Sequence, residues 1–470
     1  MIEPKSYRAD LDDLRALSSQ FGKAVPILAE LIENRRCEME ANWTRKGVKT
    51  LPDELLLPIF KQAYHSLGSR HINIPSVRSN LFAKRVSQVC RRFRCIAFSC
   101  PELWGTIHSS QPKAEVTAFV ERSHTYPLTI LIYGKDHTRF GSDMSKKDLR
   151  EFMEALAPCQ ERWKEMRITS TPSRTISQLM REVQEHIVSL PQLERLHFHR
   201  YKWDTDFDDH CDIAAWHAPN LRLFQGSGVV PTNFQSSTVS QFSLTCQINT
   251  IPEMFTGPIP ESITYLSLKM LNVSDREIVA MGPSDEPVRL PGLETLEVVS
   301  SSPGTYTTFW VFILPRLEFP CLTRLHVRVA GDRVVDLFGR LGTHQFANLR
   351  ELRFVCEDLA TVFSALRSLA KFPLLEHVIV DDCCYSSYKD TELRFSNMPS
   401  LRTLKFARCR FNNMHGAEAL AQCLIKVLDL TTFECLQFDC YDDFDELRYD
   451  RVEALRRYLK GKVRIVDCID

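Results

Sequence analysis

The sequence predicts an α/β solenoid in which many short parallel strands follow a small helical module. Three observations support this fold class. An apolar-x-x-apolar-x-apolar pattern recurs throughout the C-terminal two thirds of the chain. Helical stretches lie between several copies of the pattern. Two strongly apolar helical segments precede the first copy.

The repeated pattern begins with an apolar residue about every 27 residues, because ten intervals cover 270 residues. Side chains of a strand alternate between its two faces, so the pattern places its apolar residues on one face. The copy that begins at residue 221 is degenerate. The segments 128–132 and 463–465 are expected to supply the first and last strands. The leading residues are Trp163, Leu193, Leu221, Val239, Ile263, Leu293, Leu322, Leu349, Leu375, Leu401 and Phe433.

Helices are expected in several of the intervals, within residues 173–190, 333–341, 359–371 and 416–427. A strand, loop and helix repeated with a period in the twenties resembles the leucine-rich repeat, although the usual asparagine after the strand is missing. The resemblance implies an irregular leucine-rich-repeat horseshoe over residues 109–470.

The first helical segment, residues 51–60, reads LPDELLLPIF. Pro52 suits the first turn of a helix, where its missing N–H costs nothing. Asp53 and Glu54 place negative charge at the positive end of the helix dipole. Six of the ten residues are apolar, more than one face of a helix can hold, so the helix is expected to be covered on two sides. The six are Leu51, Leu55, Leu56, Leu57, Ile59 and Phe60.

The second segment, residues 86–107, is predicted as one helix that Pro101 ends, after which Leu103 and Trp104 fold back as a lid. Its apolar residues recur at spacings of three and four, with arginines outside this stripe. They are Val86, Val89, Phe93, Ile96 and Ala97, and the arginines are Arg91, Arg92 and Arg94.

Together the two segments resemble an F-box, which we assign to residues 47–108 after a helical leader over residues 1–46. There are two departures from the family pattern: Phe93 stands where tryptophan is more common, and residues 66–83 form a polar insertion. The arrangement resembles the large F-box families of mushroom-forming fungi. Two core helices of an ordinary helical domain are the alternative. The matching residues are Leu51, Pro52, Glu54, Leu55, Ile59, Phe60, Val89, Cys90, Arg91, Phe93, Arg94, Ile96, Ala97, Pro101, Leu103 and Trp104.

The resemblance implies a non-enzymatic, cofactor-free substrate-recognition subunit of a Skp–cullin–F-box ubiquitin ligase. The box would dock the Skp adaptor, and through it a cullin, while the solenoid would bind a target protein. One alternative is a leucine-rich scaffold that binds the adaptor but takes no part in ubiquitination. Another is an enzyme with its site in residues 202–235 or 300–316, although neither stretch offers a pair of acids or a histidine in a catalytic pattern. The docking residues implied are Leu51, Pro52, Leu55, Ile59, Phe60, Val89 and Phe93.

The polar residues of the repeated strands are expected to point outward on the concave face. Five of them form a basic patch on neighbouring strands, moderated by Glu351, that could receive an acidic or phosphorylated segment of the target. A solvated strand face of mixed charge is the alternative. The five are Arg324, His326, Arg328, Arg353 and Lys405.

The composition excludes several other classes. The chain has 59 basic and 59 acidic residues, so its balanced charge does not favour nucleic-acid binding. No apolar run approaches the roughly 20 residues that cross a bilayer. The first twenty residues are charged throughout and lack the apolar core of a signal peptide. We therefore expect a cytoplasmic or nuclear protein without a membrane partner.

The 16 cysteines contain no C-x-x-C pair, which disfavours a zinc or redox site. Cys90, Cys95 and Cys100 are interpreted as small apolar core residues of one helix. The acidic stretch 204–212 resembles a calcium loop, but Asp209 replaces the required glycine and Ala215 replaces the closing glutamate. It is interpreted as an acidic surface loop, like residues 441–450.

Overall fold

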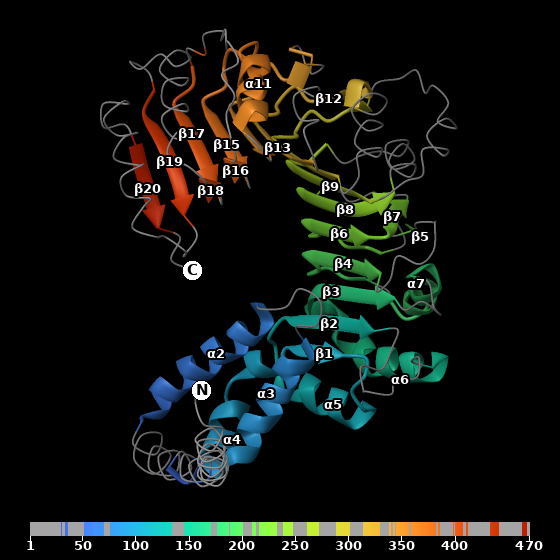
Figure 1. The fold of residues 1–470 in the computed structure, drawn as a ribbon. Helices are drawn as coiled ribbons and strands as arrows, with labels where there is room; N and C mark the ends of the chain where they lie inside the picture. Colours follow the sequence, from blue (N-terminus) through green and yellow to red (C-terminus); the bar gives the residue numbers. More distant parts are fainter. Residues whose placement is uncertain are drawn as a thin grey trace, which may run out of the picture. The chain divides into compact units, whose positions relative to one another are not determined.

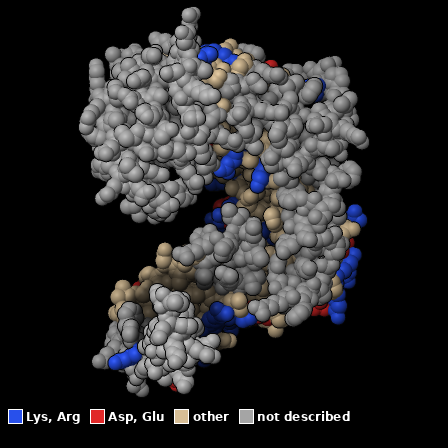
Figure 2. All heavy atoms as spheres, viewed as in Figure 1, with Lys and Arg blue, Asp and Glu red and all other residues tan. Residues whose placement is uncertain are grey.

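A computed structural model of the protein shows two compact units, Met1–Leu103 and Trp104–Asp470 (Figure 1). The first is helical and the second is built on a parallel β-sheet; each is described by itself. The residues that the structure describes, coloured by charge in Figure 2, are 30, 33–35, 51–69, 76–133, 145–170, 176–187, 189–200, 209–212, 216–232, 238–247, 261–271, 288–300, 314–329, 338–339, 342–343, 345–356, 359–381, 384–385, 398, 400–407, 410–411, 433–440 and 463–467. Most of the expected leader, the expected helix over 416–427 and the acidic stretch 441–450 lie outside them.

The helical unit begins where the sequence predicts. The carbonyl oxygen of Pro52 accepts hydrogen bonds from the N–H groups of Leu55 and Leu56, at 3.1 and 3.2 Å. Asp53 and Glu54 lie in the first turn. The described elements of this unit are α2 (Asp53–Ser69), α3 (Ser76–Val89), α4 (Arg91–Phe98) and the 3₁₀ turn η2 (Pro101–Trp104), whose last residue belongs to the second unit.

The segment predicted as one helix from Val86 to Pro101 contains the end of α3 and the whole of α4, because the chain is extended at Cys90. The Cys90 backbone has φ −159° and ψ 171°, and its sulfur accepts a hydrogen bond from the Phe93 N–H at 3.4 Å. Cys90 and Cys95 are exposed and only Cys100 is buried. The interpretation of all three as core residues of one helix is therefore wrong: the helix is broken and two of the three lie on its surface.

The stretch interpreted as a polar insertion, residues 66–83, is largely helical. α2 continues through its first four residues, and α3 takes up its last eight. Phe82 contributes to the core, where its ring meets Phe60 edge-on at 6.4 Å, and Ala83 is fully buried. Phe60 also contacts Phe93 edge-on at 5.1 Å, so one aromatic side chain joins all three helices.

The second unit contains a 14-stranded sheet in which every described pair of neighbours is parallel (Figure 1). The strands follow one another in the sheet in the same order as in the chain. The strands missing from this series form three separate two-stranded sheets. The strands of the 14-stranded sheet are β1 (Thr106–His108), β2 (Leu128–Tyr133), β3 (Trp163–Ser170), β4 (Arg195–Arg200), β6 (Leu223–Ser227), β8 (Gln241–Gln247), β9 (Tyr265–Leu271), β11 (Thr295–Ser300), β13 (Arg324–Val329), β14 (Glu351–Val355), β15 (His377–Asp381), β17 (Thr403–Ala407), β19 (Cys435–Cys440) and β20 (Val463–Asp467).

The sheet confirms the predicted repeat. Its register aligns the second apolar residue of each copy with that of the next, as in Leu196, Phe224 and Phe242, and the third apolar residues align likewise. All eleven leading residues are at most 4% exposed. The predicted first and last strands are present as β2 and β20, but residues 106–108, which we had placed in the helical module, form the additional strand β1.

Helices lie along the first strands of the sheet (Figure 1). α5 contacts β1, α7 contacts β3, and α6 lies between these two helices. α6 starts with a capping box, in which Ser145 and Asp148 satisfy each other's backbone N–H groups. Of the expected helices, those within 173–190 and 359–371 are present as α7 and α11, and residues 338–339 are helical. The bounds are α5 (Lys113–Arg122), α6 (Lys146–Leu156), η3 (Ala157–Arg162), α7 (Ile176–Gln184), η7 (Leu314–Arg316) and α11 (Leu359–Leu369).

The described strands also form three separate two-stranded parallel sheets. The first includes Asp209–Asp212, so this end of the acidic stretch is a strand paired with β7 and not a surface loop. The pairs are β5 (Asp209–Asp212) with β7 (Val229–Thr232), β10 (Val288–Arg289) with β12 (Leu317–Glu318), and β16 (Cys384–Tyr385) with β18 (Arg410–Phe411).

The degenerate copy at Leu221 is explained by the space around Gly226, which takes the third apolar position. A Cβ atom there would lie 2.6 Å from the Val229 carbonyl oxygen and 2.8 Å from a methyl carbon of Leu244. The chain turns at Gly228, whose φ is 68°, between β6 and β7, and this tight turn brings the Val229 carbonyl too close to leave room for a side chain.

We expect Gly226→Ala to destabilise the second unit by about 1–3 kcal/mol, because the added methyl group forces backbone and core to move. Thermal or denaturant unfolding would measure the change. Gly339→Ala is the matched control, since its Cβ would meet nothing within 4 Å. Equal stability of the two variants would contradict this packing argument.

Candidate functional site

One outer face of α2 exposes large apolar side chains. Leu55 is 52% exposed and Ile59 50%, although both lie one residue before core residues, Leu56 and Phe60, that are 2% and 6% exposed. Residues four apart share a helix face, so α2 has one buried apolar face and a neighbouring uncovered one.

A third exposed apolar residue of the helical unit is the last residue of α3, next to the start of α4 in the chain. Arg92 at the start of α4 donates to the Asp53 carboxylate, with Nη2 to Oδ1 at 2.6 Å, and to the Leu51 carbonyl oxygen. These bonds hold the start of α4 against the first turn of α2. Val89, three residues before Arg92, is 64% exposed. We call Leu55, Ile59 and Val89 the helical apolar surface.

The seven residues predicted to dock the adaptor fall into three groups. Leu55, Ile59 and Val89 form the helical apolar surface, and Pro52 is exposed beside it. Leu51 and Phe93 are half-buried. Phe60 lies in the core between the helices, where it supports this surface from behind.

Glu102 ties the 3₁₀ turn η2 to the middle of α2. Its carboxylate oxygens lie 2.8 Å from Lys61 Nζ and 2.7 Å from His65 Nε2. Burial acts to raise the pKa of Glu102, but the hydrogen bonds and charges of Lys61 and His65 outweigh it, so the pKa is lowered. The ionised carboxylate is the form that this contact stabilises.

One face of the main sheet carries the polar side chains that alternate with the buried apolar ones along the described strands, and we call it the polar sheet face. The predicted basic patch lies on it: Arg324, His326 and Arg328 on β13, Arg353 on β14 and Lys405 on β17. In register, His326 and Arg353 are neighbours, while Ile379 of β15 separates Arg353 from Lys405. The structure therefore brings four of these residues together and places the fifth two strands away.

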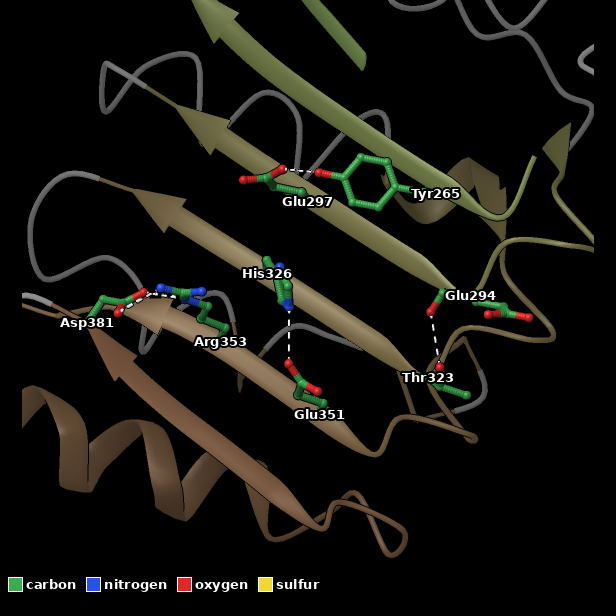
Figure 3. A network of polar contacts seen from close by, with 8 residues as sticks. All are labelled: Tyr265, Glu294, Glu297, Thr323, His326, Glu351, Arg353 and Asp381. Atoms are coloured by element: carbon green, nitrogen blue, oxygen red, sulfur yellow. Dashed lines mark hydrogen bonds and ion pairs between the residues drawn. The ribbon is translucent and has the colours of Figure 1, made fainter. Parts of the chain in front are cut away.

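Carboxylates contact Arg353 and His326 of the basic patch (Figure 3). Arg353 forms a bidentate pair with the buried Asp381, with Nε to Oδ2 at 2.5 Å, and this hydrogen bond raises the Arg353 pKa. His326 contacts Glu351 at 3.3 Å, and this hydrogen bond lowers the Glu351 pKa despite burial. The patch is a surface of mixed charge.

The remaining labelled contacts of Figure 3 extend the polar network to β9. The Tyr265 hydroxyl donates to the Glu297 carboxylate at 2.5 Å. Burial, with this hydrogen bond, raises the pKa of Tyr265 to about 12. The Thr323 hydroxyl and Arg324 are both linked to Glu294, the first through the Glu294 carbonyl oxygen at 3.2 Å and the second through its carboxylate at 3.8 Å.

A second charged cluster on the polar sheet face was missed by the sequence analysis. Glu165 on β3 is 4% exposed, and its carboxylate contacts Arg167 at 2.5 Å and Arg195 at 3.0 Å, with His197 at 3.6 Å. We call these four residues the Glu165 cluster. The sequence signal for this cluster is the acid and the arginine at outward positions of the copy that begins at Trp163, in register with Arg195 and His197.

The structure offers little support for other kinds of site. Among the described residues, no group of histidine, cysteine and acidic side chains could hold a metal ion. Within the same ranges, no helix has the length and apolar character needed to span a bilayer.

Comparison with known proteins yields no family. No family model and no curated protein matches the chain. Among solved structures, an internalin from Listeria monocytogenes is similar over 77% of this chain and 89% of its own, with 11% sequence identity and a TM-score of 0.26. A similarity of this size assigns neither a function nor a ligand.

The lowered Glu102 pKa makes a prediction about acid stability. A lowered pKa in the folded state stabilises the fold above the ordinary carboxyl pKa, and this contribution is lost as the pH falls through the folded value. We expect up to about 1 kcal/mol of stability, given the partial exposure of its partners, to be lost below about pH 4.5.

Thermal unfolding of the wild type and Glu102→Gln between pH 7 and 3 would measure this effect. The variant should be less stable at pH 7 and should converge on the wild type in acid. A constant difference between the two proteins at every pH would contradict the assignment.

Proposed function

We propose that this protein is a substrate-recognition subunit of a Skp–cullin–F-box ubiquitin ligase. The observation that carries the proposal is the helical apolar surface. It consists of Leu55, Ile59 and Val89, held on a folded unit beside a well-packed core. The sequence motifs around these residues resemble an F-box, whose known role is to dock the Skp adaptor.

Exposing these apolar side chains to water costs free energy. Covering the exposed half of each one would contribute about 1 kcal/mol per side chain. Contiguous apolar residues rimmed by polar ones commonly mark protein-interaction sites. Arg92 and Asp53 form such a rim at one end and keep α2 and α4 in a fixed geometry.

The solenoid supplies the target-binding half of this proposal. A long parallel sheet presents a rigid, repetitive surface to a protein partner. The basic patch of Arg324, His326, Arg328, Arg353 and Lys405 offers hydrogen-bond donors for this purpose. The chain itself performs no chemistry in this role; it raises the local concentration of a target lysine beside the enzyme that carries ubiquitin.

We predict that the double variant Leu55→Asp/Ile59→Asp loses adaptor binding by about 100-fold or more, because two carboxylates would be buried in an apolar interface. Isothermal titration of the full chain with purified Skp adaptor would measure this. Both side chains are half exposed, so the variant should fold, as circular dichroism would verify.

The matched control is Gln62→Asp/Gln88→Asp, which adds the same charge at exposed polar positions of α2 and α3. It should bind like the wild type. Failure of the wild-type chain to bind the adaptor would reject the proposal. An equal loss in both variants would show a general charge effect and not a docking surface.

A second experiment separates ligase from scaffold. Mixed with Skp adaptor, cullin and its RING partner, the full chain should co-elute with all of them in size-exclusion chromatography. Co-elution with the adaptor alone would contradict the ligase assignment and indicate a scaffold that binds the adaptor without acting in ubiquitination.

A further inference from the structure

The Glu165 cluster carries an excess of positive charge on the polar sheet face, distinct from the basic patch on β13, β14 and β17. Two arginines share one carboxylate, so the cluster has a net charge of +1 when its histidine, His197, is neutral. Burial lowers the pKa of His197, and the charge of Arg167 lowers it further; burial also lowers the pKa of His199. No other titratable side chain faces the cluster from β3, β4 or β6 in the described residues.

The buried carboxylate organises the two arginines. Glu165 Oε1 accepts from Arg167 Nε at 2.5 Å, and Oε2 lies 3.0 Å from Arg195 Nη2. Each arginine uses one edge of its guanidinium on Glu165. The side chains nevertheless remain 39% and 48% exposed, against 5% for Glu165. Two donors held in this way on neighbouring strands lose little entropy on binding an anion.

His197 and Gln225 complete the floor of the cluster. His197 Nδ1 lies 3.0 Å from Gln225 Oε1, one strand away. With Nδ1 protonated, the imidazole donates to this oxygen, and the amide NH₂ of the exposed Gln225 is a further donor group. On the next strands, the residues in register with Gln225 are first two small neutral ones, Ser243 and Ser267. The following strand then places Glu297 in the same row.

We infer that the Glu165 cluster receives an aspartate or glutamate of an acidic, unphosphorylated segment that a partner protein lays across β3 to β9. The net charge of +1 matches the single charge of a carboxylate, whereas a phosphate dianion would be left with an excess negative charge. Arginine forks suit a carboxylate because they can donate two parallel hydrogen bonds to it.

The surroundings favour a protein segment over a free small carboxylate. The two guanidiniums are about half exposed, so a lone small anion would stay in water and gain little. Serines at the next positions of the row let an extended backbone approach closely. The row turns acidic at Glu297, which sets the acidic end of the segment over β3 and β4.

The length of the segment follows from the sheet geometry. Four strand spacings of about 4.8 Å separate β3 from β9, or about 19 Å, which about six extended residues cover. The test therefore uses a degenerate library of peptides about twelve residues long. One central position is fixed as Asp, Glu, Asn, Gln or phosphoserine. Binding to the full chain is measured by fluorescence anisotropy.

The decisive variant is Glu165→Gln/Arg167→Gln/Arg195→Gln. It removes the ionic cluster as a whole, so no buried charge is left without its partners, and it lowers the net charge by one. Arg222→Gln is the matched control, because it removes one exposed positive charge from the neighbouring turn and leaves the cluster intact. Circular dichroism and thermal unfolding check the fold of each protein. Arg195→Lys, which keeps the charge and removes the fork, is a second variant for the case that the triple variant unfolds.

We expect peptides with Asp or Glu to bind at least about tenfold more tightly than those with Asn or Gln, a preference that the triple variant loses and Arg222→Gln retains. Arg195→Lys should weaken binding several-fold. No preference for acidic peptides, or a preference that survives the triple variant, would overturn the inference. So would loss of binding in Arg324→Gln/Arg353→Gln alone, tighter binding of phosphoserine peptides by about tenfold, or equal competition by a single-stranded RNA of similar length. The assay contains no adaptor, so its outcome is independent of whether the helical unit binds one.

Discussion

The second unit depends on one constraint: each strand can bury its apolar residues only if the next strand places its own at the same level. The buried rows run through Leu196, Phe224 and Phe242 at one level and Ile168 and Phe198 at the next. A single strand with three apolar residues has too little core to fold alone. Parallel stacking in constant register solves this problem, and it forces the polar residues of every strand into rows as well.

Within such a row, side chains of neighbouring strands are about 4.8 Å apart, so like charges side by side destabilise the sheet and opposite charges stabilise it. At the turns before the strands, Glu376 lies between Arg350 at 3.0 Å and Arg402 at 3.9 Å, and Arg402 also contacts Glu434 at 3.6 Å. On the sheet face, Arg353 has Asp381. The charged side chains thus stabilise the stacking, and Glu165 differs from Glu376 in that the carboxylate shared by two arginines is buried, with 5% of its side chain exposed against 23%.

The helical unit faces a different constraint. Among its described helices, the face of α2 that carries Leu56, Phe60 and Tyr64 occupies the core, and the neighbouring apolar face points away from it. Leu55 and Ile59 are left in water for that geometric reason. The proposed adaptor contact rests on this exposed apolar pair.

The sequence alone determined the solenoid, because a strict strand pattern at a regular period identifies both the strands and their buried faces. It also located the start of α2 through Pro52, Asp53 and Glu54, whose effects on a helix terminus are local. Only the tertiary structure decided what depends on contacts between distant residues. The break at Cys90 requires the packing of α4 against α2, and no local signal marks it. Whether a basic side chain is already paired with an acid depends on the residues that neighbouring strands place beside it. Arg353 meets Asp381 and Arg195 shares Glu165 because the parallel register brings together residues roughly one repeat apart in the chain.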